Sequence, residues 1–196
     1  QETTDEGYIV VGGTRSFGAG GLDVWLIKTN AFGDTLWTKT FGGSNSDLGY
    51  SVENTTDGGY IITGYTYSFG AGTEDIWLIK TNAAGDTLWT KTFGGSNWDI
   101  SYSVQQTADQ GYIIVGSTSS FGAGADDVWL IKTNTLGDPV WTKTFGGDYS
   151  DYGYSVQQTT DGGYIIGGNT YSFGVGVQDI WLIKTNSVGD TLWTKT

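Results

Sequence analysis

The sequence predicts an all-β fold assembled from four copies of one unit, and three observations support this. The string Trp-Leu-Ile-Lys-Thr-Asn recurs at 25–30, 77–82, 129–134 and 181–186, always 52 residues apart, which is the signature of a repeat architecture. Short segments rich in Tyr, Ile, Val, Trp and Thr alternate with turns that contain Gly and Asp, as β-strands do. No window has the i, i+3, i+4, i+7 apolar spacing of a helix.

The repeats are expected at approximately 1–52, 53–104, 105–156 and 157–196, within a single domain that covers residues 1–196. Four copies of 52 residues would need 208 positions, and the chain has 196. The twelve positions without a counterpart correspond to 41–52. One of the four sheets is therefore expected to be incomplete.

Each repeat is expected to contain four antiparallel strands, which the second repeat illustrates. The first is Tyr50–Thr55, the second Tyr60–Thr66, the third Asp75–Thr81 and the fourth Thr87–Phe93. All four are rich in β-branched and aromatic residues, and turn residues bound each of them. The order along the chain predicts a meander in which each strand pairs with the next.

Two turns within the repeat have a recognisable chemistry. The segment 56–59 joins the first two strands, and its last residue is Gly in every copy. We expect a type I turn followed by that Gly in the left-handed region, as in a G1 bulge. The same turn chemistry is expected for 82–86, around Gly85. Pro139 follows one of these turns, where an edge strand does not need its N–H.

The third strand of the repeat is apolar on both faces, with Ile76 and Leu78 on one side and Trp77 and Ile79 on the other. A strand of this kind lies in a sheet that is covered on both sides. Burying one Trp ring removes about 150–250 Å² from water, which a single four-stranded sheet cannot achieve. The fourth strand alternates polar and apolar residues, as an outer strand does.

We therefore expect the sheets to stack face to face by radial repetition, as the blades of a β-propeller do. Such a propeller would have four blades of four antiparallel strands, one of them incomplete. Eight of the nine Trp residues occupy two repeated positions, and we expect them to pack between blades. They are Trp25, Trp37, Trp77, Trp89, Trp129, Trp141, Trp181 and Trp193.

The segment 75–89, in which Asp-Ile-Trp-Leu-Ile-Lys-Thr leads through an Asn-Ala-Ala-Gly-Asp turn to Thr-Leu-Trp, resembles the PQQ-like (quinoprotein-type) propeller repeat. The whole unit is similar to tandem propeller repeats of long secreted bacterial and archaeal proteins. This resemblance covers nearly the entire chain and implies a β-propeller located outside the cell or on its surface. Propellers of this family commonly have six to eight blades, more than the four repeats present.

Composition argues against several classes of function. The chain has no His and no Cys, so it lacks a Ser-His-Asp triad, a thiol nucleophile and the usual zinc ligands. The vicinal Cys pair that the resemblance implies for quinoprotein-like enzymes is also missing. A glycoside-acting enzyme needs two specialised carboxylates, but every repeat offers the same Asp positions. We predict no enzymatic activity.

The net charge and the lengths of the apolar runs argue against two classes of partner, nucleic acids and the membrane interior. A net charge of −12 with nine Lys and Arg residues argues against nucleic-acid binding. No apolar run approaches the roughly 20 residues that span a bilayer, so membrane insertion is not expected.

Positions at which the copies differ are candidates for ligand binding, because structural requirements are shared by all four units. In the connections between repeats, Trp98, Tyr149 and Tyr152 stand where another copy has Ser46, Asn45 and Leu48, respectively. In the loop between the second and third strands, Arg15, Tyr67 and Tyr171 are the departures. Aromatic loop residues beside carboxylates are typical of protein- or carbohydrate-binding surfaces. Drift between duplicated repeats is the alternative explanation.

One set of carboxylates allows two interpretations. Asp47, Asp99 and Asp151 lie in the connections between repeats. Their oxygens could accept backbone N–H groups and fix the loops, or they could bind Ca²⁺, which prefers hard oxygen ligands. The spacing matches no Asp-x-Asp-x-Asp-Gly loop, and the structural role is the preferred interpretation.

These observations favour a non-enzymatic, secreted or surface repeat scaffold that mediates protein interaction or self-assembly. The alternative is a lectin-like propeller that binds carbohydrate on its loop face. The partner would be a protein or a glycan. A homo-oligomer in which two chains complete a ring of eight blades is a further expectation.

Overall fold

The computed structural model describes residues 1–196, and these form β-strands without any helix. Four antiparallel sheets follow one another along the chain, and within each sheet every strand pairs with its sequence neighbour. Sheet 1 has three strands, and sheets 2, 3 and 4 have four each. The predicted all-β repeat architecture is therefore confirmed. Since no helix is long and apolar enough, none crosses a membrane.

Sheet 1 contains β1 (Tyr8–Thr14), β2 (Asp23–Thr29) and β3 (Thr35–Phe41); sheet 2 contains β4 (Asp47–Asn54), β5 (Tyr60–Thr66), β6 (Asp75–Thr81) and β7 (Thr87–Phe93). Sheet 3 contains β8 (Asp99–Gln106), β9 (Tyr112–Thr118), β10 (Asp127–Thr133) and β11 (Pro139–Phe145); sheet 4 contains β12 (Asp151–Gln158), β13 (Tyr164–Thr170), β14 (Asp179–Thr185) and β15 (Thr191–Lys195).

In the second repeat, β5, β6 and β7 have the bounds predicted from the sequence, whereas β4 begins three residues before the predicted Tyr50. Asp47 pairs with Thr66 at the far end of β5, and the register shifts between Gly49 and Ser51. The strand therefore begins at Asp47 and continues through a β-bulge. The sequence did not predict this extension, because Asp and Gly are rare in strands.

The turns agree with the prediction in one case and correct it in the other. Gly85 is in the left-handed region with a φ of 76°, as expected. In the other turn the left-handed residue is the third, Gly58, or Gln110 in the next repeat, and not the invariant Gly that follows. That Gly is required for close approach, because a Cβ added at Gly59 would lie 2.1 Å from the carbonyl oxygen of Thr81.

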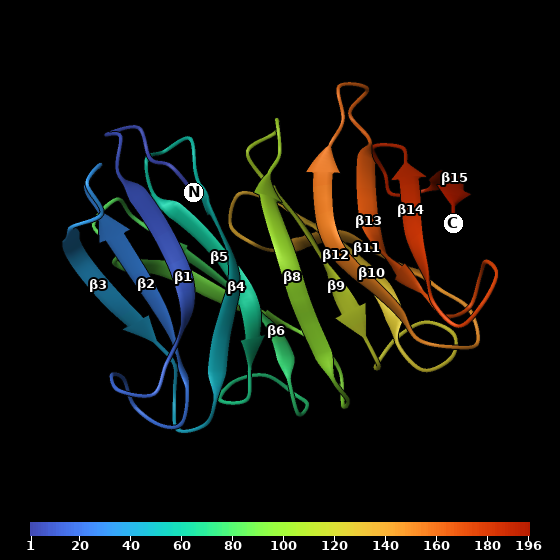
Figure 1. Cartoon of the computed structure of the whole chain (residues 1–196), viewed down its shortest axis with the longest axis horizontal. Coiled ribbons are helices and arrows are strands. Elements are labelled where there is room, and N and C mark those ends of the chain that lie inside the picture. Colours follow the sequence, from blue (N-terminus) through green and yellow to red (C-terminus); the bar gives the residue numbers. More distant parts are fainter.

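The sheets stack in sequence order, from sheet 1 to sheet 4 (Figure 1). Three buried clusters hold the stack together, and each lies between two neighbouring sheets. β6 contributes to two of them, since Ile76 and Leu78 pack toward sheet 3 while Trp77 and Ile79 pack toward sheet 1. Both faces of this strand are buried, as its apolar sequence predicts.

The repeated Trp residues differ in burial according to the sheet that carries them. Trp77, Trp129 and Trp181, on β6, β10 and β14, are buried. Trp37, Trp89 and Trp141, on β3, β7 and β11, pack at the margins of the clusters. Trp25 and Trp193 lie on the outward faces of the two end sheets, where no neighbouring sheet covers them.

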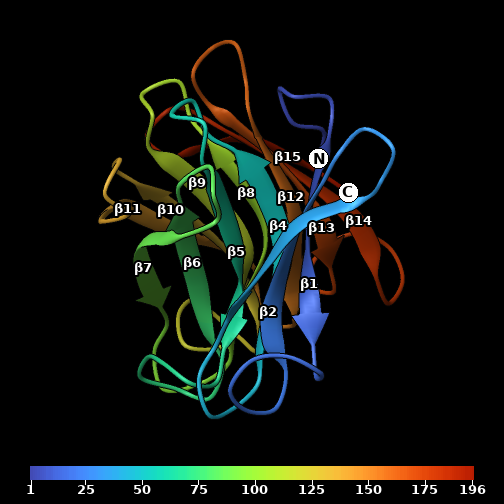
Figure 2. The same cartoon turned by 90° about the vertical axis from the view of Figure 1, so that its left-hand side faces the viewer.

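Sheets 1 and 4 stand at opposite ends of the stack and share no buried cluster (Figure 1). Figure 2 views the molecule from the side of sheet 1, over which no other sheet lies. The stack is therefore open, with two terminal faces.

Candidate binding surface

Seven tyrosines form a continuous chain of neighbouring rings across sheets 2, 3 and 4, which we call the tyrosine row. In order, they are Tyr67, Tyr65, Tyr50, Tyr102, Tyr154, Tyr152 and Tyr171. The centroids of successive rings are 5.2–6.4 Å apart, within the range of favourable aromatic pairs. Four of the seven rings are exposed and three are half-buried, so the row offers a wide aromatic surface to solvent.

The central part of the row is made by the innermost strands of the three complete sheets. Tyr50, Tyr102 and Tyr154 occupy equivalent positions in β4, β8 and β12. Each is the extra residue of a β-bulge, because the ladder register shifts across it. A bulge re-aims the side chain that it carries. Three equivalent bulges thus place three phenol rings next to one another, with centroid separations of 5.3 and 5.2 Å.

Each outer part of the row is anchored by a carboxylate at the position before the third strand of the repeat, which is Glu74 in the second repeat and Asp126 in the third. The Tyr67 hydroxyl donates a hydrogen bond to Glu74. The Tyr152 hydroxyl donates to Asp126 Oδ2 at 2.9 Å, and the Ser150 hydroxyl donates to the same oxygen at 2.8 Å. The row therefore carries negative charge beside rings in sheets 2 and 4.

Burial, or for Tyr67 a hydrogen bond, raises the pKa of six phenols of the row, namely Tyr50, Tyr65, Tyr67, Tyr102, Tyr152 and Tyr154. Burial, with smaller effects of the neighbouring phenols and of Asp126, raises the pKa of Tyr102. The hydrogen bond to Glu74, with smaller effects of burial and charge, raises the pKa of Tyr67 to about 12. At neutral pH the surface thus presents aromatic faces and hydroxyl groups that can donate or accept hydrogen bonds.

Three of the residues singled out from the sequence belong to the row, namely Tyr67, Tyr152 and Tyr171. The other three lie outside it: Trp98 is half-buried, whereas Tyr149 and Arg15 are exposed. The tyrosines that all complete repeats share were not among the predicted residues, because departures between repeats do not include them. Their recurrence every 52 residues within Tyr-Ser-Val was a signal that could have found them.

The carboxylates considered for Ca²⁺ hold the connections between sheets. Asp47 is fully buried, accepts the Gly43 N–H at 2.9 Å and the Ser68 hydroxyl at 2.7 Å, and also accepts a hydrogen bond from Thr66. Asp99 and Asp151 are buried in the same way, each with a Gly N–H and a Ser hydroxyl on one oxygen. No group of three acidic side chains converges to hold a metal ion.

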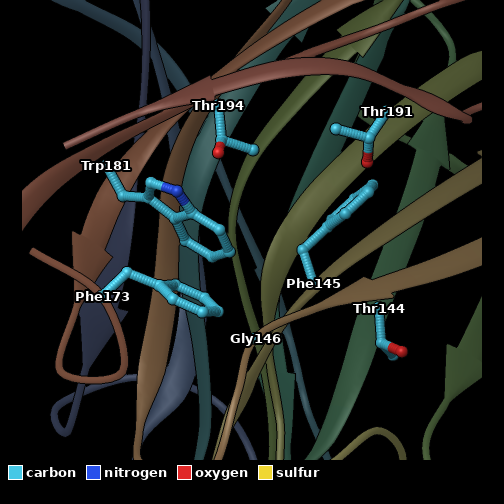
Figure 3. Close-up of a pocket in the computed structure, with 7 residues that line it drawn as sticks. All are labelled: Thr144, Phe145, Gly146, Phe173, Trp181, Thr191 and Thr194. Atoms are coloured by element: carbon cyan, nitrogen blue, oxygen red, sulfur yellow. The ribbon is translucent and has the colours of Figure 1, made fainter.

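A pocket of about 320 Å³ lies between sheets 3 and 4, where Phe145 faces Phe173 and Trp181 (Figure 3). An equivalent pocket of about 290 Å³ lies between sheets 1 and 2. The remaining lining residues are Gly and Thr, without a charged side chain. Neither pocket offers an acid, a base or a metal ligand for catalysis.

The outward faces of the two end sheets are more apolar than a solvated surface requires. On sheet 4, Ile180 is 73% exposed, whereas its counterpart Ile76 in sheet 2 is 0% exposed. On sheet 1, Val10 is 47% exposed, whereas its counterpart Ile62 is 1% exposed. We call them the trailing face (Ile180, Leu182, Trp193 and Lys195) and the leading face (Tyr8, Val10, Trp25, Gly33 and Asp34).

No protein-family model matches this chain, and no curated protein matches it either.

Proposed function

We propose that the protein is a non-enzymatic repeat scaffold that assembles head to tail, with the trailing face of one copy on the leading face of the next. One observation carries this proposal. The two exposed faces are the opposite halves of the interface that already joins sheets 1 to 2, 2 to 3 and 3 to 4 inside the chain.

The apolar residues of the two faces correspond to those of the internal interfaces. Between sheets 2 and 3, Ile76 and Leu78 pack in one cluster with Tyr112, Ile114 and Trp129. The trailing face carries Ile180 and Leu182 at the positions of the first two. On the leading face, Tyr8, Val10 and Trp25 stand at the positions of the other three. Burial of each large apolar side chain contributes roughly 1.5–3 kcal/mol, so several together can offset the entropic cost of association.

The charged groups of the two faces also correspond. Each internal interface has an ion pair between an outer strand and the turn of the next sheet, as between Lys91 and Asp138 at 2.7 Å. Their counterparts at the ends are Lys195 on the trailing face and Asp34 on the leading face, and neither forms an ion pair. Docking of two copies would bring these opposite charges together.

A steric match accompanies the charges. A Cβ added at Gly85 would lie 2.8 Å from the Trp37 ring of the preceding sheet, and Gly137 and Gly189 meet Trp89 and Trp141 in the same way. At Gly33, their counterpart on the leading face, an added Cβ would meet nothing. Trp193 on the trailing face is the ring that a neighbouring copy would place there.

The proposal extends to a β-propeller. Four-stranded antiparallel blades, sequential stacking and adjacent innermost strands support a radial arrangement. Two chains joined at both pairs of faces would supply eight sheets and close the ring. A place outside the cell or on its surface, and kinship with PQQ-like repeats, belong to the same proposal.

Light scattering coupled to size exclusion at micromolar concentration tests the assembly. We expect a mass of a multiple of 21.0 kDa. Ile180→Glu should reduce the assembly to monomers, whereas Leu136→Glu, at an exposed turn of sheet 3, should not. Lys195→Asp or Asp34→Lys alone should weaken association, and the double variant should restore it. A monomer at every concentration, unaffected by these changes, would overturn the proposal.

A second candidate function rests on the tyrosine row. Exposed phenol rings beside Glu74 and Asp126 could stack on sugar rings and bind their hydroxyl groups, as a lectin-like surface does. A glycan array with and without Ca²⁺ tests this candidate, with Tyr154→Ala and Trp98→Ala as variants. Binding lost in the first variant and kept in the second would locate the ligand on the row. A silent array would leave the scaffold function alone.

A further inference from the structure

A pocket of about 510 Å³ opens where the loops of sheets 1 and 2 meet the connection between these sheets. Its walls are Gly21 in the β1–β2 loop, Tyr67 in the β5–β6 loop, and Ser44, Asn45 and Ser46 in the segment that joins β3 to β4. All five residues belong to a junction inside the chain. The volume falls within the range of small-molecule sites, roughly 300–1,000 Å³.

Hydrogen bonds hold the walls of this pocket together. The Tyr67 N–H donates to the Ser46 carbonyl oxygen at 3.0 Å, and the Asn45 side-chain amide donates to the Tyr67 carbonyl oxygen at 3.1 Å. On the side of sheet 1, the Asp47 N–H donates to the Leu22 carbonyl oxygen at 2.6 Å. The pocket is therefore formed before a ligand arrives, which lowers the entropic cost of binding.

The Tyr67 ring is a fixed aromatic surface on one side of the pocket. Its hydroxyl donates a hydrogen bond to Glu74, and the ring stands nearly perpendicular to that of Tyr65, with centroids 5.8 Å apart. Tyr67 is nevertheless 42% exposed. A tyrosine ring held in this way offers a ligand amphipathic contact area at a low cost in conformational entropy.

The Ser46 hydroxyl lacks the acceptor that its counterpart has. In the junction of sheets 3 and 4, the equivalent Ser150 donates to Asp126 at 2.8 Å. Beside Ser46, the position of Asp126 is occupied by Leu22. Ser46 is half-buried, and its hydroxyl oxygen would lie 2.9 Å from a Cβ added at Gly21. The pocket thus contains a hydroxyl group that is available to a ligand.

The corresponding position in the next junction carries a large side chain. Trp98 stands at the position of Ser46, and Thr73 stands at that of Gly21. Trp98 is half-buried. The fold therefore accepts an indole ring at this position, and the space that such a ring needs is left open by Ser46.

The lining of the pocket favours a neutral ligand that carries hydroxyl groups. No Lys or Arg belongs to the lining, so no side chain there would neutralise a phosphate or a carboxylate. The net charge of −12 disfavours an anion further. The polar groups are two serine hydroxyls and an amide, which donate and accept hydrogen bonds. A sugar ring combines such hydroxyl groups with an apolar face.

We propose that this pocket binds one neutral pyranose residue of a carbohydrate. The C–H face of the sugar packs on the Tyr67 ring, and its hydroxyl groups form hydrogen bonds with Ser44, Asn45 and Ser46. The inference goes beyond assembly through the end faces. It also holds if the middle of the tyrosine row binds nothing, because it places the sugar at the junction of sheets 1 and 2.

The test is an NMR titration of the full, isotope-labelled chain with the methyl glycosides of glucose, galactose and mannose. At least one sugar should produce saturable shifts in the amide resonances of Gly21, Asn45 and Tyr67. The uronic acid of the best-bound sugar, which adds a carboxylate, should bind at least tenfold more weakly. No saturable shift of these amides by any of the sugars up to its solubility would overturn the inference.

Ser46→Trp gives this junction the side chain of Trp98, so it should melt at the temperature of the parent chain and bind the sugar at least tenfold more weakly. Tyr67→Ser, which copies Ser119, should weaken binding at least as much. Ser150→Trp, the same substitution in the junction of sheets 3 and 4, is the matched control and should bind as the parent does. Equal binding by Ser46→Trp and the parent would contradict the proposal.

Two further variants separate this pocket from the other proposals. Binding lost in Tyr154→Ala and kept in Ser46→Trp would locate the sugar on the tyrosine row and overturn the inference. Ile180→Glu, which alters an end face, should bind the sugar as the parent does. Light scattering on the same samples should show that Ser46→Trp leaves the mass of the assembly unchanged.

Discussion

Thr63 on β5 and Ser101 on β8 share a hydrogen bond of 2.5 Å between their side-chain oxygens, fully buried between sheets 2 and 3. Ser101 also binds the Gly64 carbonyl oxygen at 2.9 Å. The corresponding pair between sheets 1 and 2 is Val11 with Gly49, where an added Cβ would lie 2.5 Å from the valine methyl group. This site therefore accepts threonine with serine or valine with glycine, and not a mixture of the two.

The effects of replacing Thr63 and Ser101 on the free energy of unfolding are expected to be strongly non-additive. Thr63→Val removes the hydrogen-bond partner of Ser101 and brings a methyl group against the serine side chain. Ser101→Gly leaves the Thr63 hydroxyl without a good hydrogen-bond partner. Each variant should lose about 1–3 kcal/mol of unfolding free energy. The double variant recreates the valine–glycine pair and should recover most of this loss. Urea unfolding of the four proteins gives the coupling. Additive losses would contradict the paired role.

Removal of the carboxylate beside a buried lysine should destabilise the chain. Lys80 is buried, and its ammonium group lies 2.9 Å from Asp57 and 2.8 Å from the Thr81 carbonyl oxygen. Asp57→Asn should cost about 1–3 kcal/mol at pH 7, toward the lower value because the carboxylate is half exposed. Asp86→Asn, which breaks the exposed pair with Lys39, is the control and should cost little.

The same pair predicts sensitivity to acid. Burial alone would raise the pKa of Asp57, but hydrogen bonds from Thr55, Lys80 and Gly59 outweigh it and lower the pKa to about 2. A folded-state pKa below the unfolded value near 3.9 stabilises the fold above pH 4, and this stabilisation is lost as the pH falls toward 2. Unfolding free energies measured between pH 5 and 2 should fall less steeply in Asp57→Asn.

Asp127 predicts the opposite dependence in another pH window. Burial, with the nearby charges of Asp151 and Asp126, raises its pKa to about 6. Because the folded state favours protonated Asp127, protonation of this carboxyl adds to the free energy of unfolding. This contribution is complete below pH 4 and is lost as the pH rises to 6. A carboxyl resonance that titrates near pH 6 in NMR and disappears in Asp127→Asn would verify the shift. A midpoint near 4 would contradict it.

The turn between the first two strands predicts a contrast between adjacent glycines. Gly59→Ala places a methyl group 2.1 Å from the Thr81 carbonyl oxygen and should destabilise by several kcal/mol. Gly58→Ala meets open space and costs only the left-handed backbone, about 1–2 kcal/mol. Conversely, Gln110→Gly, at a φ of 65°, should raise the melting temperature. Equal losses of stability in Gly58→Ala and Gly59→Ala would show that backbone conformation alone, and not the contact with Thr81, determines the cost.

The strand positions could be predicted because one pattern is repeated four times with the same spacing, so each turn and apolar run is supported by several copies. The bulge at Tyr50 could not, because Asp47 and Gly49 favour turns locally and only the pairing with β5 keeps them extended. The tyrosine row likewise depends on the distance between strands of different sheets.

The clusters confined to neighbouring sheets make this molecule a one-dimensional series of contacts and not a single core. Sheets 2 and 3 are held from both sides, whereas sheets 1 and 4 are each held from one. Opening should therefore begin at the ends and move inward, so that amide hydrogens of β6 and β10 exchange more slowly than those of β2 and β14. Contact between the terminal faces of two copies would abolish this gradient, because every sheet would then be an internal one.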